Sequence, residues 1–144
     1  MIEREWEAPI ELVWELWTTP EGRGSWFGPK GFQVEVTAFE LRVGGSFAYT
    51  MTATDPGMVA MMEKKGRPAS FGVEATITAV ETNRHLAWEA PHGPETLSTS
   101  VTFTEEDGRV KMVLVLDATK PDMTGGAAMG WKSSLSRFEE RLGA

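Results

Sequence analysis

Cysteine is absent from this 144-residue sequence, which excludes disulfide bonds, thiolate metal sites and cysteine nucleophiles. Histidine occurs only twice, at His85 and His92, and without cysteine this pair does not make the usual structural zinc site. The sequence also contains no Gly-x-Ser-x-Gly elbow, His-Glu-x-x-His pair, phosphate loop or dinucleotide fingerprint. It therefore predicts no metal, no cofactor and no catalytic residue.

Basic clusters and long apolar runs are absent too. The 14 lysines and arginines are outnumbered by 21 acidic residues, giving a net charge of −7, which argues against a nucleic-acid or anionic-membrane partner. No apolar run approaches the ~18 residues of a membrane span, so membrane insertion is not expected. Residues 1–6 lack the basic and apolar regions of a signal peptide, which favours a cytoplasmic protein.

The last part of the chain carries the clearest helical pattern. Apolar residues recur at steps of three and four, a spacing that puts them on one stripe of a helix: Ala128, Trp131, Leu135, Phe138 and Leu142. The helix should begin near Thr124 and stop at Gly143, with Arg137 among the residues of its solvated back. So large an apolar stripe must be covered by another layer.

Residues 125–130, at the start of this helix, are rich in glycine and alanine. They are interpreted as letting the helix approach the sheet or as leaving room for a ligand. An anion-binding helix start is the alternative.

The rest of the chain predicts the covering sheet. Residues 2–7 alternate as a first strand, a helix follows Pro9 to about Trp17, and a shorter helix runs from Thr19 to about Trp26. Further strands are expected at 32–41, 46–54, 70–81, 85–90, 96–105 and 109–117. The order predicts a single α+β domain over 1–144, with a curved antiparallel sheet of about six to seven strands wrapped around the last helix.

The segment from residue 55 to residue 69 contains Met58, Met61 and Met62. Flexible, polarisable methionines suit an adaptable surface. We expect a loop more mobile than the strands, bordering a cavity mouth or a homodimer contact. A hairpin tip without a role is the alternative.

Four local motifs carry a resemblance to a known family. They are the opening helix at 9–21, the Trp26-Phe27-Gly28-Pro29 turn, the hairpin at 40–47, and the closing helix from Gly130-Trp131 onward. Together they resemble the START-like, or helix-grip, superfamily, which includes polyketide cyclases. Within it they resemble the branch named after the activator of heat-shock-protein ATPase, the Aha type. The resemblance covers the whole chain and implies the helix-grip fold.

Function is less constrained by this resemblance, because one fold hosts many functions. The first hypothesis is binding of a small, mostly apolar, aromatic or lipid-like molecule in a cavity between the sheet and the last helix. One alternative is a polyketide-cyclase-like enzyme that uses the same cavity. The other is an interaction module that activates a chaperone ATPase in a stress response.

The ligand-binding candidates combine aromatic side chains with three polar groups. Trp26 is expected at the cavity mouth and Tyr49 as a polar anchor. Glu74 lies on the less apolar face of its strand, where exposure is expected. It is also the first carboxylate to test, because burial in the cavity would raise its pKa toward a general-acid role. The full set is Trp17, Trp26, Phe47, Tyr49, Phe71, Glu74, Trp88, Thr99, Phe103, Met112, Trp131 and Leu135.

Overall fold

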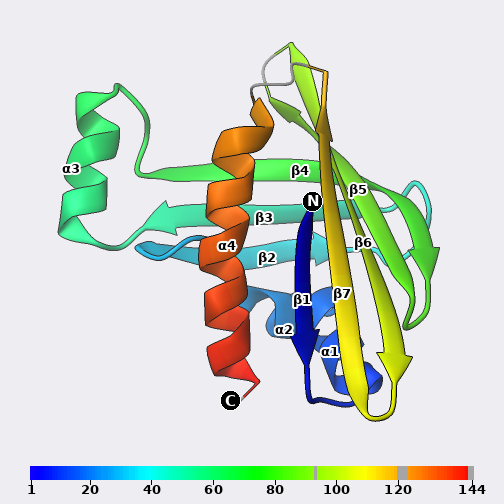
Figure 1. Cartoon of the computed structure of the whole chain (residues 1–144). Helices are drawn as coiled ribbons and strands as arrows, with labels where there is room; N and C mark the ends of the chain where they lie inside the picture. The colour runs from blue at the N-terminus through cyan, green and yellow to red at the C-terminus, as the bar shows by residue number, and fades with distance from the viewer. Residues whose placement is uncertain (93, 120–122, 143–144) are drawn as a thin grey trace.

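A computed structural model describes residues 1–92, 94–119 and 123–142. Its strands form one antiparallel sheet in the order β1-β7-β6-β5-β4-β3-β2, so that β1 pairs with the last strand (Figure 1). The strands are β1 (Ile2–Trp6), β2 (Phe32–Phe39), β3 (Ser46–Ala53), β4 (Ser70–Glu81), β5 (His85–His92), β6 (Glu95–Glu106) and β7 (Arg109–Ala118). The predicted α+β helix-grip architecture is confirmed.

The long helix α4 (Met123–Arg141) crosses one face of the sheet, as Figure 1 shows. Its inward stripe is the one that the spacing predicts, because Trp131, Leu135 and Phe138 are all buried. These residues join the inward-facing side chains of the strands in one hydrophobic core. The core therefore lies between the curved sheet and α4.

Two short helices follow β1, as expected: α1 (Ile10–Thr18) and α2 (Pro20–Gly24). Thr19 caps α2, since its hydroxyl accepts a hydrogen bond of 3.1 Å from the amide of Gly22. Gly22 also allows the two helices to meet, because an added Cβ would lie 2.7 Å from the carbonyl oxygen of Glu15. This close contact fixes α2 and its side chains against α1.

A third helix, α3 (Pro56–Lys64), replaces the loop that was expected between β3 and β4. Asp55 caps it by accepting a hydrogen bond of 3.1 Å from the amide of Met58, and Pro56 occupies the first turn. The loop prediction was wrong because an apolar pattern of nine residues is too short to indicate a helix. Met58, Met61 and Met62 nevertheless sit at helical spacing. The expected mobility of 55–69 stays a prediction.

Arg137 corrects a second expectation. It does not lie on a solvated back of α4; it is half-buried, and its Nη1 contacts the carbonyl oxygens of Phe27 (3.3 Å), Gly28 (2.9 Å) and Phe32 (3.1 Å). Gly28 has a φ of +99°, a conformation that favours glycine. Arg137 thus ties the turn after α2 to the last helix.

None of the described helices is both long and apolar enough to cross a membrane.

Candidate functional site

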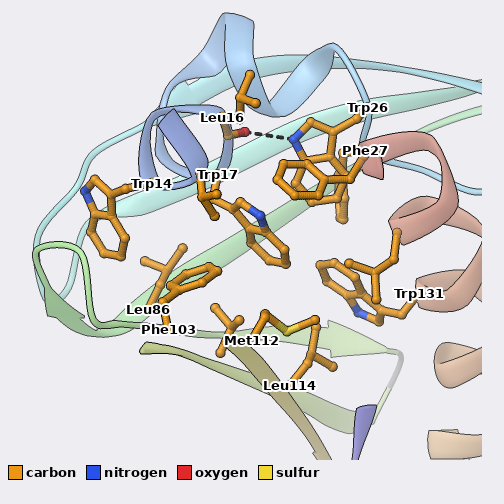
Figure 2. Close-up of a cluster of buried hydrophobic side chains, with 14 of the residues drawn as sticks. Trp14, Leu16, Trp17, Trp26, Phe27, Leu86, Phe103, Met112, Leu114 and Trp131 are labelled. Carbon is orange, nitrogen blue, oxygen red and sulfur yellow. Dashed lines mark hydrogen bonds between the residues drawn. The ribbon is translucent and has the colours of Figure 1, made fainter. Parts of the chain in front are cut away.

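A fully buried arginine lies in the core beneath α2. Arg23 has no exposed surface, although arginine is almost never fully buried without a partner. Its side chain extends inward from α2 between α1, the sheet and α4. The sequence places Trp26 and Phe27 three and four residues later, and both turn toward the same interior (Figure 2).

Six aromatic rings surround its guanidinium. We call these six residues the aromatic box; they come from α1, the turn after α2, β3, β5 and α4. The distances from the Arg23 Cζ to the ring centroids are 5.2 Å for Trp17, 5.3 Å for Trp26, 4.3 Å for Phe27, 4.8 Å for Phe47, 4.7 Å for Trp88 and 5.7 Å for Trp131. All lie within the range of cation–π attraction, which offsets part of the cost of burying the charge.

The rings of the box also pack against one another. The indoles of Trp17 and Trp131 are nearly parallel, at 4° with centroids 5.6 Å apart, and Trp17 and Trp26 lie 4.8 Å apart. Figure 2 shows these side chains converging from α1, the turn after α2 and α4. The space between the sheet and α4 is therefore largely filled with aromatic side chains at this level.

Three polar atoms, two of Arg23 and one of the aromatic box, have no hydrogen-bond partner among the described residues. Arg23 Nη1 donates a bond of 3.0 Å to the carbonyl oxygen of Trp17, whereas Arg23 Nε and Nη2 and the indole Nε1 of Trp17 are buried and unpaired. Trp26 differs, since its Nε1 donates a bond of 2.8 Å to the carbonyl oxygen of Leu16 (Figure 2). Unpaired buried donors are costly, and all three of these lack an acceptor.

Burial lowers the pKa of Arg23 to about 9, well below that of an exposed arginine, an effect that Tyr49 partly offsets. The side chain is therefore still charged at neutral pH. Burial in turn raises the pKa of Tyr49, which the charge of Arg23 lowers in part. The Tyr49 ring lies 5.2 Å from Phe27 and 5.1 Å from Phe47, so it forms the partly exposed edge of the box.

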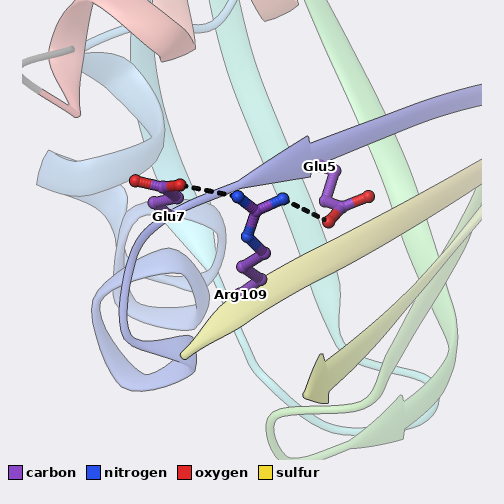
Figure 3. Close-up of polar contacts among 3 residues, drawn as sticks. All are labelled: Glu5, Glu7 and Arg109. Atoms are coloured by element: carbon purple, nitrogen blue, oxygen red, sulfur yellow. Dashed lines mark hydrogen bonds and ion pairs between the residues drawn. The ribbon is translucent and has the colours of Figure 1, made fainter. Parts of the chain in front are cut away.

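Arg109 shows how an arginine of this chain is paired at the surface. Its guanidinium contacts Glu5 at 3.2 Å and Glu7 at 2.8 Å, and these carboxylates raise its pKa (Figure 3). This cluster is exposed, so it contributes little to stability. The ion pairs among the described residues do not include Arg23, whose charge faces six aromatic rings and the carbonyl oxygen of Trp17.

The structure brings most of the predicted site residues together. Trp17, Trp26, Phe47, Trp88 and Trp131 belong to the aromatic box and Tyr49 to its edge. The remaining inward-facing candidates lie farther along the same layer, with Thr99 beside Trp88 in the register of β5 and β6: Thr99, Phe103, Met112 and Leu135. The expectation that Trp26 lies at a cavity mouth was wrong, because Trp26 is fully buried.

Glu74 does not belong to this site. Successive residues of a strand point to opposite faces, and its neighbours Val73 and Ala75 face inward. Glu74 is accordingly exposed on the outer face of the sheet. We correct its assignment as a cavity residue and as the first carboxylate to test for acid catalysis.

Phe71 lies elsewhere on the sheet, at the base of α3. It lines an apolar surface groove of about 350 Å³ together with residues of α3 and the following turn: Phe32, Met58, Met61, Met62, Lys65, Arg67 and Pro68. The groove and the aromatic box are lined by different residues. Phe71 is thus a candidate for this second surface and not for the box.

Sequence reasoning missed Arg23 and Phe27. An arginine between two glycines, Gly22 and Gly24, is typical of a solvated turn. The available signal was its spacing from Trp26 and Phe27, which puts all three on one side if the short helix continues into the turn. Only tertiary contacts with Phe47 and Trp88 show that this side is the core.

The start of α4 leaves open space. A Cβ added at Gly130 would meet no atom within 4 Å, and the same holds at Gly125. Met129 between them is 75% exposed. Gly125 is itself exposed, so the space beside it is solvent, whereas Ala128 of the same segment packs against the core. The interpretation that this segment lets the helix approach the sheet or leaves room for a ligand stays a prediction.

The model of the family described as "Activator of Hsp90 ATPase homolog 1-like protein" matches residues 7–143, nearly the whole chain. The chain belongs to the AHSA1-like family. No curated protein matches it. Membership confirms the branch of the superfamily that the four sequence motifs resemble.

Solved structures of similar proteins show the same fold. Protein Ms6760 from Mycobacterium smegmatis is 22% identical, with a TM-score of 0.76 over 98% of this chain and 88% of that one. Protein CV1439 from Chromobacterium violaceum is 18% identical, with a TM-score of 0.76 over 94% and 91%. An AHSA1-like protein from Aeromonas hydrophila is 24% identical, with a TM-score of 0.64 over 97% and 92%. At these identities the likeness concerns the fold alone.

Proposed function

We propose that this AHSA1-like protein binds a small, largely aromatic molecule between the sheet and α4, at the aromatic box. The observation that carries the proposal is the group of buried, unpaired donors on Trp17 and Arg23. A core that served packing alone would place apolar atoms there, because each unpaired donor lowers stability. A ligand that accepts hydrogen bonds removes this cost.

The walls of the site suit a planar ring system. Flat aromatic rings stack with one another and with other flat molecules, and these contacts add to the gain from burying apolar surface. The box presents Trp17, Trp26 and Trp131 from three different elements, with Tyr49 at its exposed edge. A ligand enters by parting rings that now touch.

The experiment is isothermal titration of the full chain with planar aromatic compounds that carry oxygen acceptors. We expect micromolar dissociation constants for the best compounds. Trp131→Leu should weaken binding about tenfold or more, by analogy with aromatic hot spots. Trp14→Phe is the matched control, because Trp14 packs on Phe103 and is not among the rings that surround Arg23. Equal weakening by both variants, or no binding to the wild type, contradicts the proposal.

Catalysis of the polyketide-cyclase type stays an alternative use of the same interior. Tyr49 would then be the proton-transfer group to test, since burial and Arg23 both act on its pKa. Tyr49→Phe separates the two functions. A binding site should lose about 0.5–1.5 kcal/mol of affinity with one hydrogen bond, whereas an enzyme should lose turnover far more than affinity.

A second candidate function is protein interaction through α3. The apolar groove beside Met61, flanked by Lys65 and Arg67, favours an acidic partner segment with apolar side chains. The family description points to one test, the ATPase turnover of an Hsp90 chaperone with and without this protein. Stimulation that Met61→Glu abolishes and Trp131→Leu spares supports this function. Unchanged turnover rejects it.

A further inference from the structure

We propose that the molecule bound in the aromatic box carries a carboxylate, or an oxyanion of the same planar shape, and that Arg23 is its anchor. The inference rests on the proposed interior binding and adds the ligand class. It depends on three features of Arg23: the edge of the guanidinium that is unpaired, the charge of its surroundings, and the rigidity of its support.

The unpaired atoms are the right pair for an anion. Nε and Nη2 lie along one edge of the planar guanidinium, and their N–H bonds point the same way. A carboxylate accepts two parallel hydrogen bonds from such an edge, which is the strongest contact that arginine makes. The third nitrogen, Nη1, is already used by the carbonyl of Trp17. The residue is therefore held by one nitrogen and unpaired at the other two.

The charge of the surroundings also calls for an anion. The groups that face Arg23 are six aromatic rings and the phenol of Tyr49, and its charge is not matched by a carboxylate of the described chain. Ring faces attract a cation, but they leave a net positive charge in a medium of low polarity. A ligand with one negative charge neutralises it, whereas a neutral ligand of the same shape does not.

The backbone and the guanidinium of Arg23 are both held in a fixed position, as expected of a residue that anchors a ligand. Gly22 packs α2 against α1 so closely that no larger residue fits. The carbonyl oxygen of Trp17, a residue of α1, holds the guanidinium. Arg23 itself therefore loses little freedom on binding, and only the rings around it must part to admit a ligand. Tyr49 at the edge of the box can supply a further donor to the anion.

The test uses matched pairs of acid and amide: 2-naphthoate with 2-naphthamide, cinnamate with cinnamamide, and biphenyl-4-carboxylate with its amide. Each is titrated calorimetrically into the wild-type chain and into Arg23→Met, a near-isosteric neutral variant. We expect the wild type to prefer the acid of the best pair by about tenfold or more. In Arg23→Met the acid and its amide should bind within about threefold of each other.

The outcomes separate this inference from the proposed function. Amides that bind the wild type as tightly as the acids overturn the anchor but leave interior binding intact. A preference for acids that survives in Arg23→Met also overturns the anchor. Failure of every compound to bind the wild type overturns both.

A second measurement needs no variant. The Nε–H resonance of Arg23 should be visible in nitrogen-edited spectra, because the group is buried. Saturation with 2-naphthoate should shift it downfield, as a new charge-assisted hydrogen bond does. A resonance that stays in place shows that the anion binds elsewhere and overturns the inference.

Discussion

Arg23 donates a hydrogen bond of 3.0 Å to the carbonyl oxygen of Trp17, and its Cζ lies 5.2 Å from the ring of the same residue. Trp17 thus contacts this charge with both its backbone and its side chain. The same indole has an unpaired Nε1. These two residues link α1 to α2 in the centre of the core, and in the proposed function they supply the donors that a ligand would meet.

Stability should reveal whether Arg23 is there for folding or for binding. Replacing a buried charge by an apolar side chain of similar volume is neutral or stabilising by about 1–4 kcal/mol, so Arg23→Met should not lower the free energy of unfolding. Arg137→Met is the control. It removes a guanidinium that contacts three carbonyls, and should cost about 1–3 kcal/mol.

Urea denaturation at pH 7 measures both variants. If Arg23→Met loses as much stability as Arg137→Met, Arg23 is a structural cation that the aromatic rings need. That result would remove the main support for a ligand anchor.

Alkaline pH should weaken the binding of acids and spare the binding of amides. The pKa of Arg23 in the folded protein is about 9, well below that of an exposed arginine. The anchor is therefore charged below about pH 9, and the affinity for 2-naphthoate should fall by up to about tenfold per pH unit above it. Tyr49 is the titratable group that interacts with Arg23, and burial raises its pKa. When Tyr49 ionises at still higher pH, its negative charge should repel the bound carboxylate.

The same shift affects stability with a defined sign. Above about pH 9 the unfolded chain, in which the pKa of Arg23 is higher, holds the proton more tightly than the folded chain does, so this group makes the folded state more stable as pH rises. Calorimetric titrations of 2-naphthoate and 2-naphthamide from neutral to alkaline pH test the predicted loss of affinity for the acid. An acid whose affinity stays constant through pH 10 contradicts it.

The packing of α4 gives a prediction on stability alone. Leu135 is fully buried between α4 and the sheet, and Leu135→Ala should cost about 2–5 kcal/mol because it leaves a cavity. Met129→Ala on the same helix is the control: Met129 is 75% exposed and should change stability by less than about 0.5 kcal/mol. Equal effects of the two variants would mean that α4 packs by a different face.

Much of this architecture could be predicted from the sequence, because its signals are periodic. The steps of three and four from Trp131 to Phe138 specify one helix face, and the alternation along β4 and β6 specifies strands. Such patterns survive without knowledge of tertiary contacts. The aromatic candidates followed from the same patterns, since inward positions of strands and helices converge on one core.

The rest depends on contacts that are distant in sequence. Arg23 is a single residue between glycines, and only Phe47, Trp88 and Trp131, brought from three other elements, make it buried. Arg137 has the spacing of a solvated position, yet the turn at Gly28 folds onto it. The helix α3 is short enough that its cap at Asp55 matters more than its periodicity.

The helix α3 should be the least stable of the longer elements. It contacts the body of the protein through β3, and Met61 is 42% exposed. Hydrogen exchange followed by mass spectrometry should show residues 55–69 exchanging well before residues 96–106 and 109–117. Equal protection of the two regions would exclude a mobile segment beside the groove.

The most direct test of interior binding follows the tryptophan indoles during a titration with 2-naphthoate. Nitrogen–proton spectra resolve each Nε1–H. The account predicts that Trp17 and Trp131 shift and saturate, and that Trp17, unpaired in the free protein, moves downfield on gaining an acceptor. Trp6 should shift least, because it is not one of the rings around Arg23 and its Nε1 already donates a hydrogen bond of 2.9 Å to Glu139. Indole resonances that remain unchanged at millimolar ligand, or that all shift alike, would contradict a binding site at Arg23.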